Sequence, residues 1–222
     1  MVVIITLDGP SGTGKSSVAK RLAERLGFTY VDTGAMYRAI TYKLLQKQIP
    51  LEDNIAIERE LTGLHYQIQN VQGQKRYWIS GEDVTEAIRS AEVNQNVSAV
   101  SALPSVRRAM TALQRRCAEE ESVVFEGRDM GSVVFPQADH KFFLTARPEV
   151  AAERRYKELA AKQPHLTPEA VQSDLQRRDA LDAGRALAPL KPAADAELVD
   201  TSDMTLDQVV QVLLDRILAK GV

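Results

Sequence analysis

The stretch Gly9-Pro-Ser-Gly-Thr-Gly14-Lys15-Ser16 has the residue types and the spacing of a phosphate-binding loop, G-x-x-x-x-G-K-[ST]. Its glycines allow a tight turn in which successive backbone N–H groups point inward at phosphate oxygens. A helix that begins at Lys15 would aim its positive end at the same place. Lys15 is then expected on the β- and γ-phosphates of a nucleotide, and the Ser16 hydroxyl on Mg²⁺. The predicted nucleotide-binding residues are Gly9, Pro10, Ser11, Gly12, Thr13, Gly14, Lys15, Ser16 and Ser17.

Two carboxylates follow apolar runs and could assist a metal ion. Glu126 closes the run 123–125, and Asp8 closes the run 2–7. Folds that carry this loop place a carboxylate at the end of such a strand, where it holds Mg²⁺, often through water. A solvated strand end is the ordinary alternative for Glu126. We therefore treat both residues as candidate magnesium ligands that act through water.

Arginines gather in three segments next to expected turns. These are Asp32-Thr-Gly-Ala-Met-Tyr-Arg38, Gly127-Arg128-Asp129-Met-Gly131 and Arg178-Asp179-Ala-Leu-Asp182-Ala-Gly-Arg185. A single surface arginine is usually solvated. Several of them at strand and helix ends, in a chain of formal net charge -2, indicate a pocket for more than one phosphate group.

The elements that must position these residues alternate between strands and helices. The run 2–7 is apolar on both faces, as is typical of a central parallel strand, and four more strands are predicted at 28–31, 122–125, 140–144 and 197–199. Helices are predicted at 15–26, 35–46, 83–90, 92–101, 104–120, 148–161 and 205–220, and another begins at Pro168 with Thr167 as its cap. Such alternation predicts an α/β fold with a parallel sheet, whose carboxyl edge would carry the arginines. Alternating residues within 61–81 predict an inserted β-hairpin.

Composition excludes several classes of protein. The chain has 222 residues, enough for one core with an inserted subdomain, and its net charge does not favour binding to nucleic acid or to a membrane surface. Cys117 is the only cysteine, which excludes an internal disulfide framework and a cysteine-based zinc site. The apolar run 2–7 is too short for a signal peptide, and no stretch has the ~20 apolar residues of a membrane span. We expect a cytoplasmic protein.

Taken together, the motifs resemble those of the bacterial cytidylate kinases, which are P-loop nucleoside monophosphate kinases. The matching segments run in order from residue 4 to about residue 200: Asp8-Gly-Pro-Ser-Gly with Gly14-Lys15, Thr33-Gly-Ala-Met-Tyr-Arg38, Gly81-Glu-Asp-Val84, Glu126-Gly-Arg-Asp-Met-Gly-Ser-Val-Val-Phe-Pro136 and Ala188-Pro-Leu190. The chain departs from the family at two positions. Ser16 stands where some members carry Gly, which favours direct magnesium ligation, and Glu126 stands where Asp is common.

The resemblance implies transfer of the γ-phosphoryl group of ATP to CMP or dCMP, with Mg²⁺, by a monomer. It implies a single P-loop kinase domain over 1–222 with a five-stranded parallel sheet flanked by helices. Within it, about 61–100 would form a small nucleoside-monophosphate-binding subdomain with the hairpin, and about 150–185 a lid.

The resemblance also assigns roles to residues. The CMP phosphate would be held by Arg38, Arg128 and Arg185 with Thr33 nearby, the cytosine by Ser98, Arg107 and Asp129, and the sugar by Arg178 and Asp182. Lys15 and the three phosphate-binding arginines would be catalytic, and Arg154 and Arg155 would close over ATP. A solvated helix face is the ordinary alternative for Arg107, Arg154 and Arg155.

The choice of base has a chemical reason. Cytosine presents an N4 amino donor beside the N3 and O2 acceptors, and a carboxylate paired with an arginine matches that edge. Uracil presents an O4 acceptor instead, which a carboxylate opposes. Asp129 with Arg107 would therefore favour cytosine over uracil.

Three other functions compete with this one. The nearest is another small-molecule P-loop kinase, acting on adenylate, thymidylate, shikimate or dephospho-coenzyme A, from which the hairpin and Gly-Arg-Asp-Met-Gly discriminate. A nucleotide-dependent switch usually carries an N/T-K-x-D motif, which the sequence lacks. A regulatory module without activity is disfavoured by Lys15, Ser16 and the full set of arginines.

Overall fold

The computed structural model describes residues 2–71, 74–160 and 165–221, and the chain divides into two compact units. Unit 1 consists of Met1–Asp32 and Arg115–Val222, and unit 2 of Thr33–Gln114. Each unit has its own sheet and its own apolar core. The predicted insert of about 61–100 falls within unit 2, which is larger.

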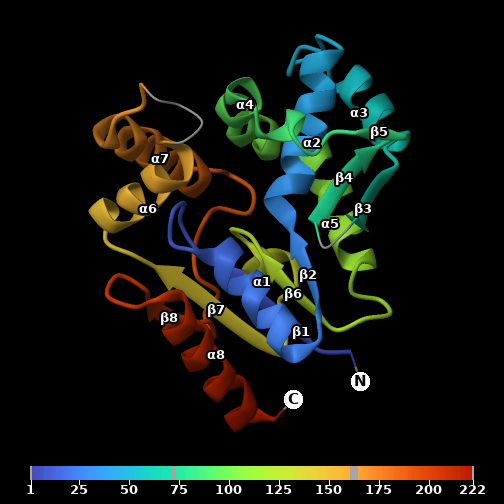
Figure 1. Cartoon of the computed structure of the whole chain (residues 1–222). Coiled ribbons are helices and arrows are strands. Elements are labelled where there is room, and N and C mark those ends of the chain that lie inside the picture. Colours follow the sequence, from blue (N-terminus) through green and yellow to red (C-terminus); the bar gives the residue numbers. More distant parts are fainter. Residues whose placement is uncertain (1, 72–73, 161–164, 222) are drawn as a thin grey trace. The chain divides into compact units, whose positions relative to one another are not determined.

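Unit 1 is built on a five-stranded parallel sheet of β1 (Ile4–Asp8), β2 (Thr29–Asp32), β6 (Val123–Glu126), β7 (His140–Thr145) and β8 (Glu197–Asp200). The strand order is β2-β6-β1-β7-β8, which puts β1 in the centre (Figure 1). The predicted α/β fold and its five parallel strands are confirmed. The central place of β1 explains why its sequence is apolar on both faces.

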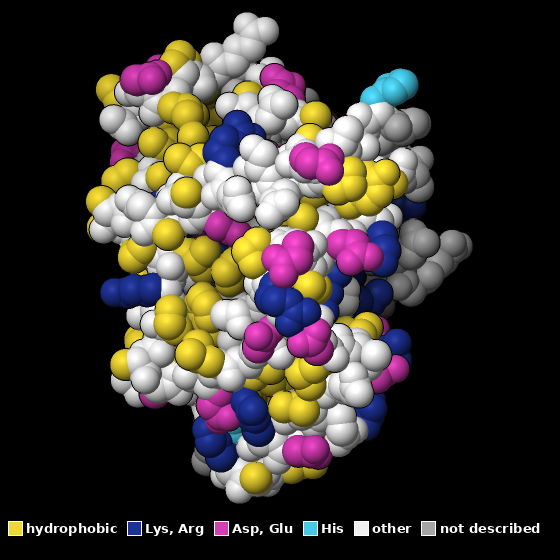
Figure 2. Space-filling model, turned by 90° about the vertical axis from the view of Figure 1, so that its left-hand side faces the viewer, with side chains coloured by type: hydrophobic (Ala, Val, Ile, Leu, Met, Phe, Trp, Pro, Cys, Tyr) yellow, Lys and Arg dark blue, Asp and Glu magenta, His cyan; other side chains and the backbone are white. Residues whose placement is uncertain are grey.

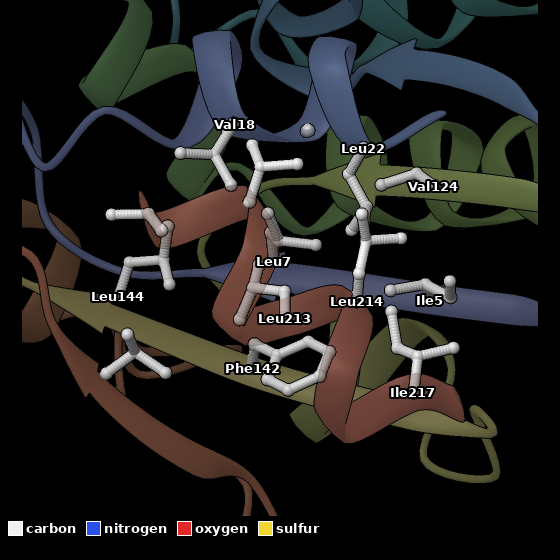
Figure 3. Packing of buried hydrophobic residues seen from close by; sticks show 14 of the residues in the cluster. Ile5, Leu7, Val18, Leu22, Val124, Phe142, Leu144, Leu213, Leu214 and Ile217 are labelled. Atoms are coloured by element: carbon white, nitrogen blue, oxygen red, sulfur yellow. The ribbon is translucent and has the colours of Figure 1, made fainter. Parts of the chain in front are cut away.

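Helices α1 (Lys15–Leu26) and α8 (Leu206–Lys220) pack together on one face of this sheet. Their buried side chains converge on residues of the strands (Figure 3): Val18 and Leu22 from α1, Leu213, Leu214 and Ile217 from α8, and Ile5, Leu7, Val124, Phe142 and Leu144 from the sheet. The bounds of α1 are those predicted, because Gly27 ends the helix with φ 70°, a left-handed conformation suited to glycine. A capping box between Thr205 and Gln208 fixes the start of α8.

Two further helices of unit 1, α6 (Pro148–Ala160) and α7 (Pro168–Ala183), share a small core of their own. That core contains Ala151, Ala152, Val171 and Leu175. Thr167 caps α7 by accepting a hydrogen bond from the N–H of Ala170, as predicted. The predicted end of α6, residue 161, lies outside the described residues.

Unit 2 contains α2 (Thr33–Gln46), α3 (Asn54–Thr62), the 3-10 turn η1 (Ala87–Arg89), α4 (Ala91–Ala102) and most of α5 (Pro104–Arg116). Its antiparallel sheet has the order β3 (Tyr66–Val71), β4 (Gln74–Ile79) and β5 (Glu82–Asp83). The predicted hairpin is confirmed, with Tyr66 opposite Ile79. Its core joins α2 to the sheet and η1 through Ala35, Ala39, Tyr77, Ile79, Val84 and Ile88.

Several local predictions were wrong. The helix expected over 83–90 is β5 followed by a single 3-10 turn, because Asp83 accepts the N–H of Thr85 while Thr85 accepts that of Tyr77. The helix expected over 104–120 ends at Arg116. Helix α3 was missed, although Asp53 caps it by accepting the N–H of Ala56. The π-helical turn η2 (Met130–Val134) was also missed.

Charges of both signs are interspersed on the face shown in Figure 2, in keeping with the net charge of -2. Over 2–71, 74–160 and 165–221, no helix combines the length and the apolar character that crossing a membrane requires.

Leu213→Ala should lower the free energy of unfolding by about 3 kcal/mol, because it leaves a cavity in the core of unit 1. Leu218, on the same helix, is 66% exposed, so Leu218→Ala should change the free energy of unfolding by less than about 0.5 kcal/mol. Urea titrations followed by circular dichroism measure both. Equal losses in the two variants would contradict the packing of α8 described here.

Candidate active site

The loop between β1 and α1 has the backbone that phosphate binding requires. Gly9, Gly12 and Gly14 have φ values of 144°, 76° and 87°, which residues with a Cβ rarely adopt. Space is also restricted: a Cβ on Gly9 would lie 2.1 Å from the carbonyl oxygen of Leu144, and one on Gly12 2.7 Å from that of Ala151. The glycines of the motif are therefore required by the fold of unit 1.

Lys15 is buried at the start of α1, with 6% of its surface exposed. Its ammonium donates to the carbonyl oxygen of Pro10 and to Thr13 Oγ1, the latter at 3.2 Å. Burial and the neighbouring Arg128 lower its pKa to about 7, against the opposing charges of Glu126, Asp179 and Asp8. A buried lysine with this pKa is placed to gain from the arrival of a polyanion.

Glu126, at the end of β6, is buried beside the loop and held by two hydroxyl groups. Ser16 Oγ donates to its Oε2 at 2.7 Å, and Tyr30 Oη donates to its Oε1 at 2.5 Å. Burial, followed by the charge of Asp32, raises the pKa of Glu126. Because the Ser16 hydroxyl donates its hydrogen bond to Glu126, the lone pairs of its oxygen stay available to a cation. A hydroxyl and a carboxylate are the hard oxygen donors that Mg²⁺ prefers, so these residues fit the ion.

Asp8 has a different position from the one expected of a metal ligand. Its two oxygens accept the backbone N–H groups of Met130 at 2.9 Å and Gly131 at 2.8 Å, and burial raises its pKa to about 6. Arg115 donates to the carbonyls of Val133 and Val134 at the other end of η2. Asp8 thus anchors the segment that carries Arg128 and the buried Asp129. Its contact with magnesium through water stays a prediction.

A carboxylate on α7 holds two of the predicted arginines. Asp182 accepts from Arg128 Nε at 3.1 Å through one oxygen and from Arg185 through the other. Arg128 Nη2 also donates to Ser11 Oγ of the loop at 2.8 Å. Asp179, one turn earlier on α7, accepts the backbone N–H of Ser11 at 2.9 Å. The structure therefore brings Arg128, Asp182 and Arg185 together beside the phosphate loop.

Four predicted acceptor residues lie in unit 2. Thr33 and Arg38 are on α2, Ser98 on α4 and Arg107 on α5. Arg107 is buried, its guanidinium lies 5.5 Å from the ring centre of Tyr37, and Nη1 donates to the carbonyl of Ser101 at 3.4 Å. Arg107 is therefore not on a solvated helix face.

The two arginines predicted to close over ATP differ in their contacts. Arg154 donates to Thr201 Oγ1 at 2.9 Å and to the Thr201 carbonyl at 2.6 Å, and Thr201 Oγ1 also bonds the carbonyl of Thr13 in the loop. Arg155 pairs with Glu158 on its own helix at 2.8 Å. Arg154 is thus linked to the phosphate loop through Thr201. The contact of Arg155 with Glu158 makes no such link.

Comparison with known proteins gives one consistent result. A family model described as Cytidylate kinase matches residues 5–219. The chain belongs to the cytidylate kinase family. It is 46% identical over 217 residues to the cytidylate kinase of Protochlamydia amoebophila, covering 96% of this chain and 95% of that protein. It is 48% identical over 213 residues to that of Rhodococcus jostii, covering 96% and 93%.

The fold of this family member is also found in a solved structure. An uncharacterized protein from Eubacterium ventriosum superimposes with a TM-score of 0.55 over 99% of both chains, at 12% identity. At this level of identity the likeness concerns the fold alone.

Four residues of the site were not predicted from the sequence: Tyr30, Arg115, Asp179 and Thr201. Tyr30 had a usable signal, because strand periodicity places it on the same side as Asp32, which lies opposite Glu126 in the sheet. Asp179 stood in a motif that was noted for its arginines. Arg115 and Thr201 reach the site through contacts between distant segments, which leave no local pattern.

Binding of ATP should take up about one proton near pH 8.5, because Lys15 with a pKa of about 7 has lost its proton there and the phosphates restore it. Near pH 6 the lysine is already charged, so no uptake is expected from it. Calorimetry in buffers of different ionisation enthalpy measures the proton. Lys15→Met is the control and should show no uptake at either pH; the same uptake in this variant would assign the proton elsewhere.

Proposed function

We infer that the protein is a cytidylate kinase, which transfers the γ-phosphoryl group of ATP to CMP or dCMP. The observation that carries this conclusion is the family match over residues 5–219. It agrees with a complete phosphate loop whose lysine is buried at the start of α1. In the reaction an oxygen of the acceptor phosphate forms a bond to the γ-phosphorus, and the bond to the bridging oxygen breaks, which releases ADP.

On the donor side, we propose that the loop amides and Lys15 bind the phosphates of ATP. Ser16 would ligate Mg²⁺ directly, with Glu126 orienting the hydroxyl and Asp8 acting through water. The ion, when bound, supplies positive charge to the phosphates. The support for this assignment is the bond from Ser16 to Glu126, which leaves the hydroxyl oxygen free to ligate.

On the acceptor side, Arg128 and Arg185 are proposed to bind the CMP phosphate, together with Arg38 and Thr33. Asp182 fixes both of the first two guanidinium groups, so less freedom is lost when the phosphate binds. Two arginines around one carboxylate leave a net positive charge for a phosphate. Asp182 and Arg178 are proposed to bind the sugar as well.

We propose that Asp129, with Ser98 and Arg107, reads the cytosine. A carboxylate accepts from the N4 amino group and opposes the O4 of uracil. From the resemblance we propose that residues of about 61–100 form the acceptor-binding subdomain. We also propose that residues of about 150–185 form a lid over ATP, with Arg154 and Arg155. Their closure would exclude water and so prevent hydrolysis of ATP. From the same resemblance we propose a monomer that acts in the cytoplasm.

ATP turnover against a panel of acceptors tests the function. With Mg²⁺ present, CMP and dCMP should be phosphorylated at least ~10-fold more efficiently, in kcat/KM, than UMP, AMP and dTMP, since the site opposes the wrong hydrogen-bonding pattern. Chelation of the ion by EDTA should stop turnover reversibly. Preferred turnover of AMP or dTMP, or full rates in EDTA, would overturn the assignment.

Asp129→Asn should lower the ratio of kcat/KM for CMP over UMP by about tenfold or more, because the amide can also donate to O4 while the charge-assisted bond to N4 is lost. Steady-state kinetics with both nucleotides gives the ratio. Asp174→Asn, on the exposed side of α7, serves as the control. If both rates fall together at an unchanged ratio, Asp129 supports the loop and the base is read elsewhere.

A further inference from the structure

The residue Ser11 of the phosphate loop is held twice from helix α7. Its backbone N–H donates to the carboxylate of Asp179, at 2.9 Å and 3.2 Å from the two oxygens. Its side-chain oxygen accepts from Arg128, which in turn donates to Asp182. The two carboxylates are three residues apart, and therefore on one face of α7. One turn of this helix thus binds the loop both directly and through an arginine.

These contacts are partly buried. Ser11 is 7% exposed, and the side chain of Asp182 is 6% exposed. Even partial burial makes a hydrogen bond to a backbone N–H stronger than one on the open surface. Burial and Arg128 lower the pKa of Lys15, and the Asp179 charge is among those that oppose this, so Asp179 lies within electrostatic range of the lysine.

We propose that Asp179 is a positioning residue that couples the binding of the phosphate donor to the binding of the acceptor. It fixes the loop proposed to bind ATP to the C-terminal end of α7, where Arg178 and Asp182 lie in the helix and Arg185 follows it. These three residues are proposed to bind CMP. The inference rests on the proposed function, because it takes both sets of roles from it.

The coupling arises because one ligand orders residues that bind the other. When ATP phosphates fix the loop, the N–H of Ser11 is fixed as well, and through Asp179 the last turns of α7. Arg178 and Arg185 then lose less freedom when CMP binds, so CMP binds more tightly. Linkage makes the effect reciprocal, since CMP must raise the affinity for the donor by the same factor. Asp179 needs only an acceptor oxygen for this task, not its charge.

The test is the affinity for CMP with and without a saturating, non-hydrolysable ATP analogue and Mg²⁺, measured by calorimetry. In the wild type the analogue should lower the Kd for CMP by about 5-fold or more. In Asp179→Ala the analogue should change the Kd for CMP by less than about 2-fold. Asp179→Asn keeps an oxygen that accepts the Ser11 N–H, and should retain most of the coupling. Asp174→Ala is the matched control, because Asp174 lies on the same helix and pairs with Arg177.

Each outcome decides the question. Loss of coupling in the Ala variant with retention in the Asn variant supports the proposal. An unchanged factor in Asp179→Ala, or a wild-type factor of one, overturns it while leaving the proposed function intact, since CMP would still bind and be phosphorylated. Failure of the wild type to bind CMP would overturn the proposed function instead, and this inference with it. If Asp179→Ala does not fold, Asp179→Leu keeps the volume without an acceptor and takes its place.

Discussion

Charged side chains are buried around the carboxyl end of β1, and their need for partners determines the structure of the site. Asp8, Lys15, Glu126 and Asp182 are each less than 9% exposed. An unpaired buried ion costs several kcal/mol, so each carboxylate is surrounded by donors. Lys15 is the exception: burial dominates, and its pKa falls to about 7. The charges of Glu126, Asp179 and Asp8 do not offset the burial, so an arriving anion would favour the charged form of Lys15.

The same partners hold the side chains of the site in place. The turn η2 is anchored by Asp8 at its start and by Arg115 at its end, so the residues before it have a fixed backbone. Arg128 is held by both Ser11 and Asp182. Phosphoryl transfer depends on positioning and on neutralisation of charge, so donors that are already oriented lower its barrier.

The phosphate loop does not by itself identify the reaction, because kinases with different acceptors share it. We propose that the acceptor is specified by residues at other positions, among them Asp129 and the arginines of unit 1. The family match covers these segments as well as the loop, which is why it discriminates against kinases for adenylate, thymidylate or shikimate. The same match and the absence of an N/T-K-x-D motif disfavour a nucleotide-dependent switch.

The sequence by itself determined the phosphate loop, the bounds of α1 and the five parallel strands, because glycine spacing and apolar periodicity are local patterns. Helix α3 was missed, although its cap Asp53 is a local signal that could have been recognised. Only the tertiary structure decided which groups meet. Asp179 and Ser11 are 168 residues apart, and Thr201 lies 188 residues from Thr13. Hydrogen bonds between residues so distant depend on how the strands and α7 pack, and packing leaves no mark in either segment alone.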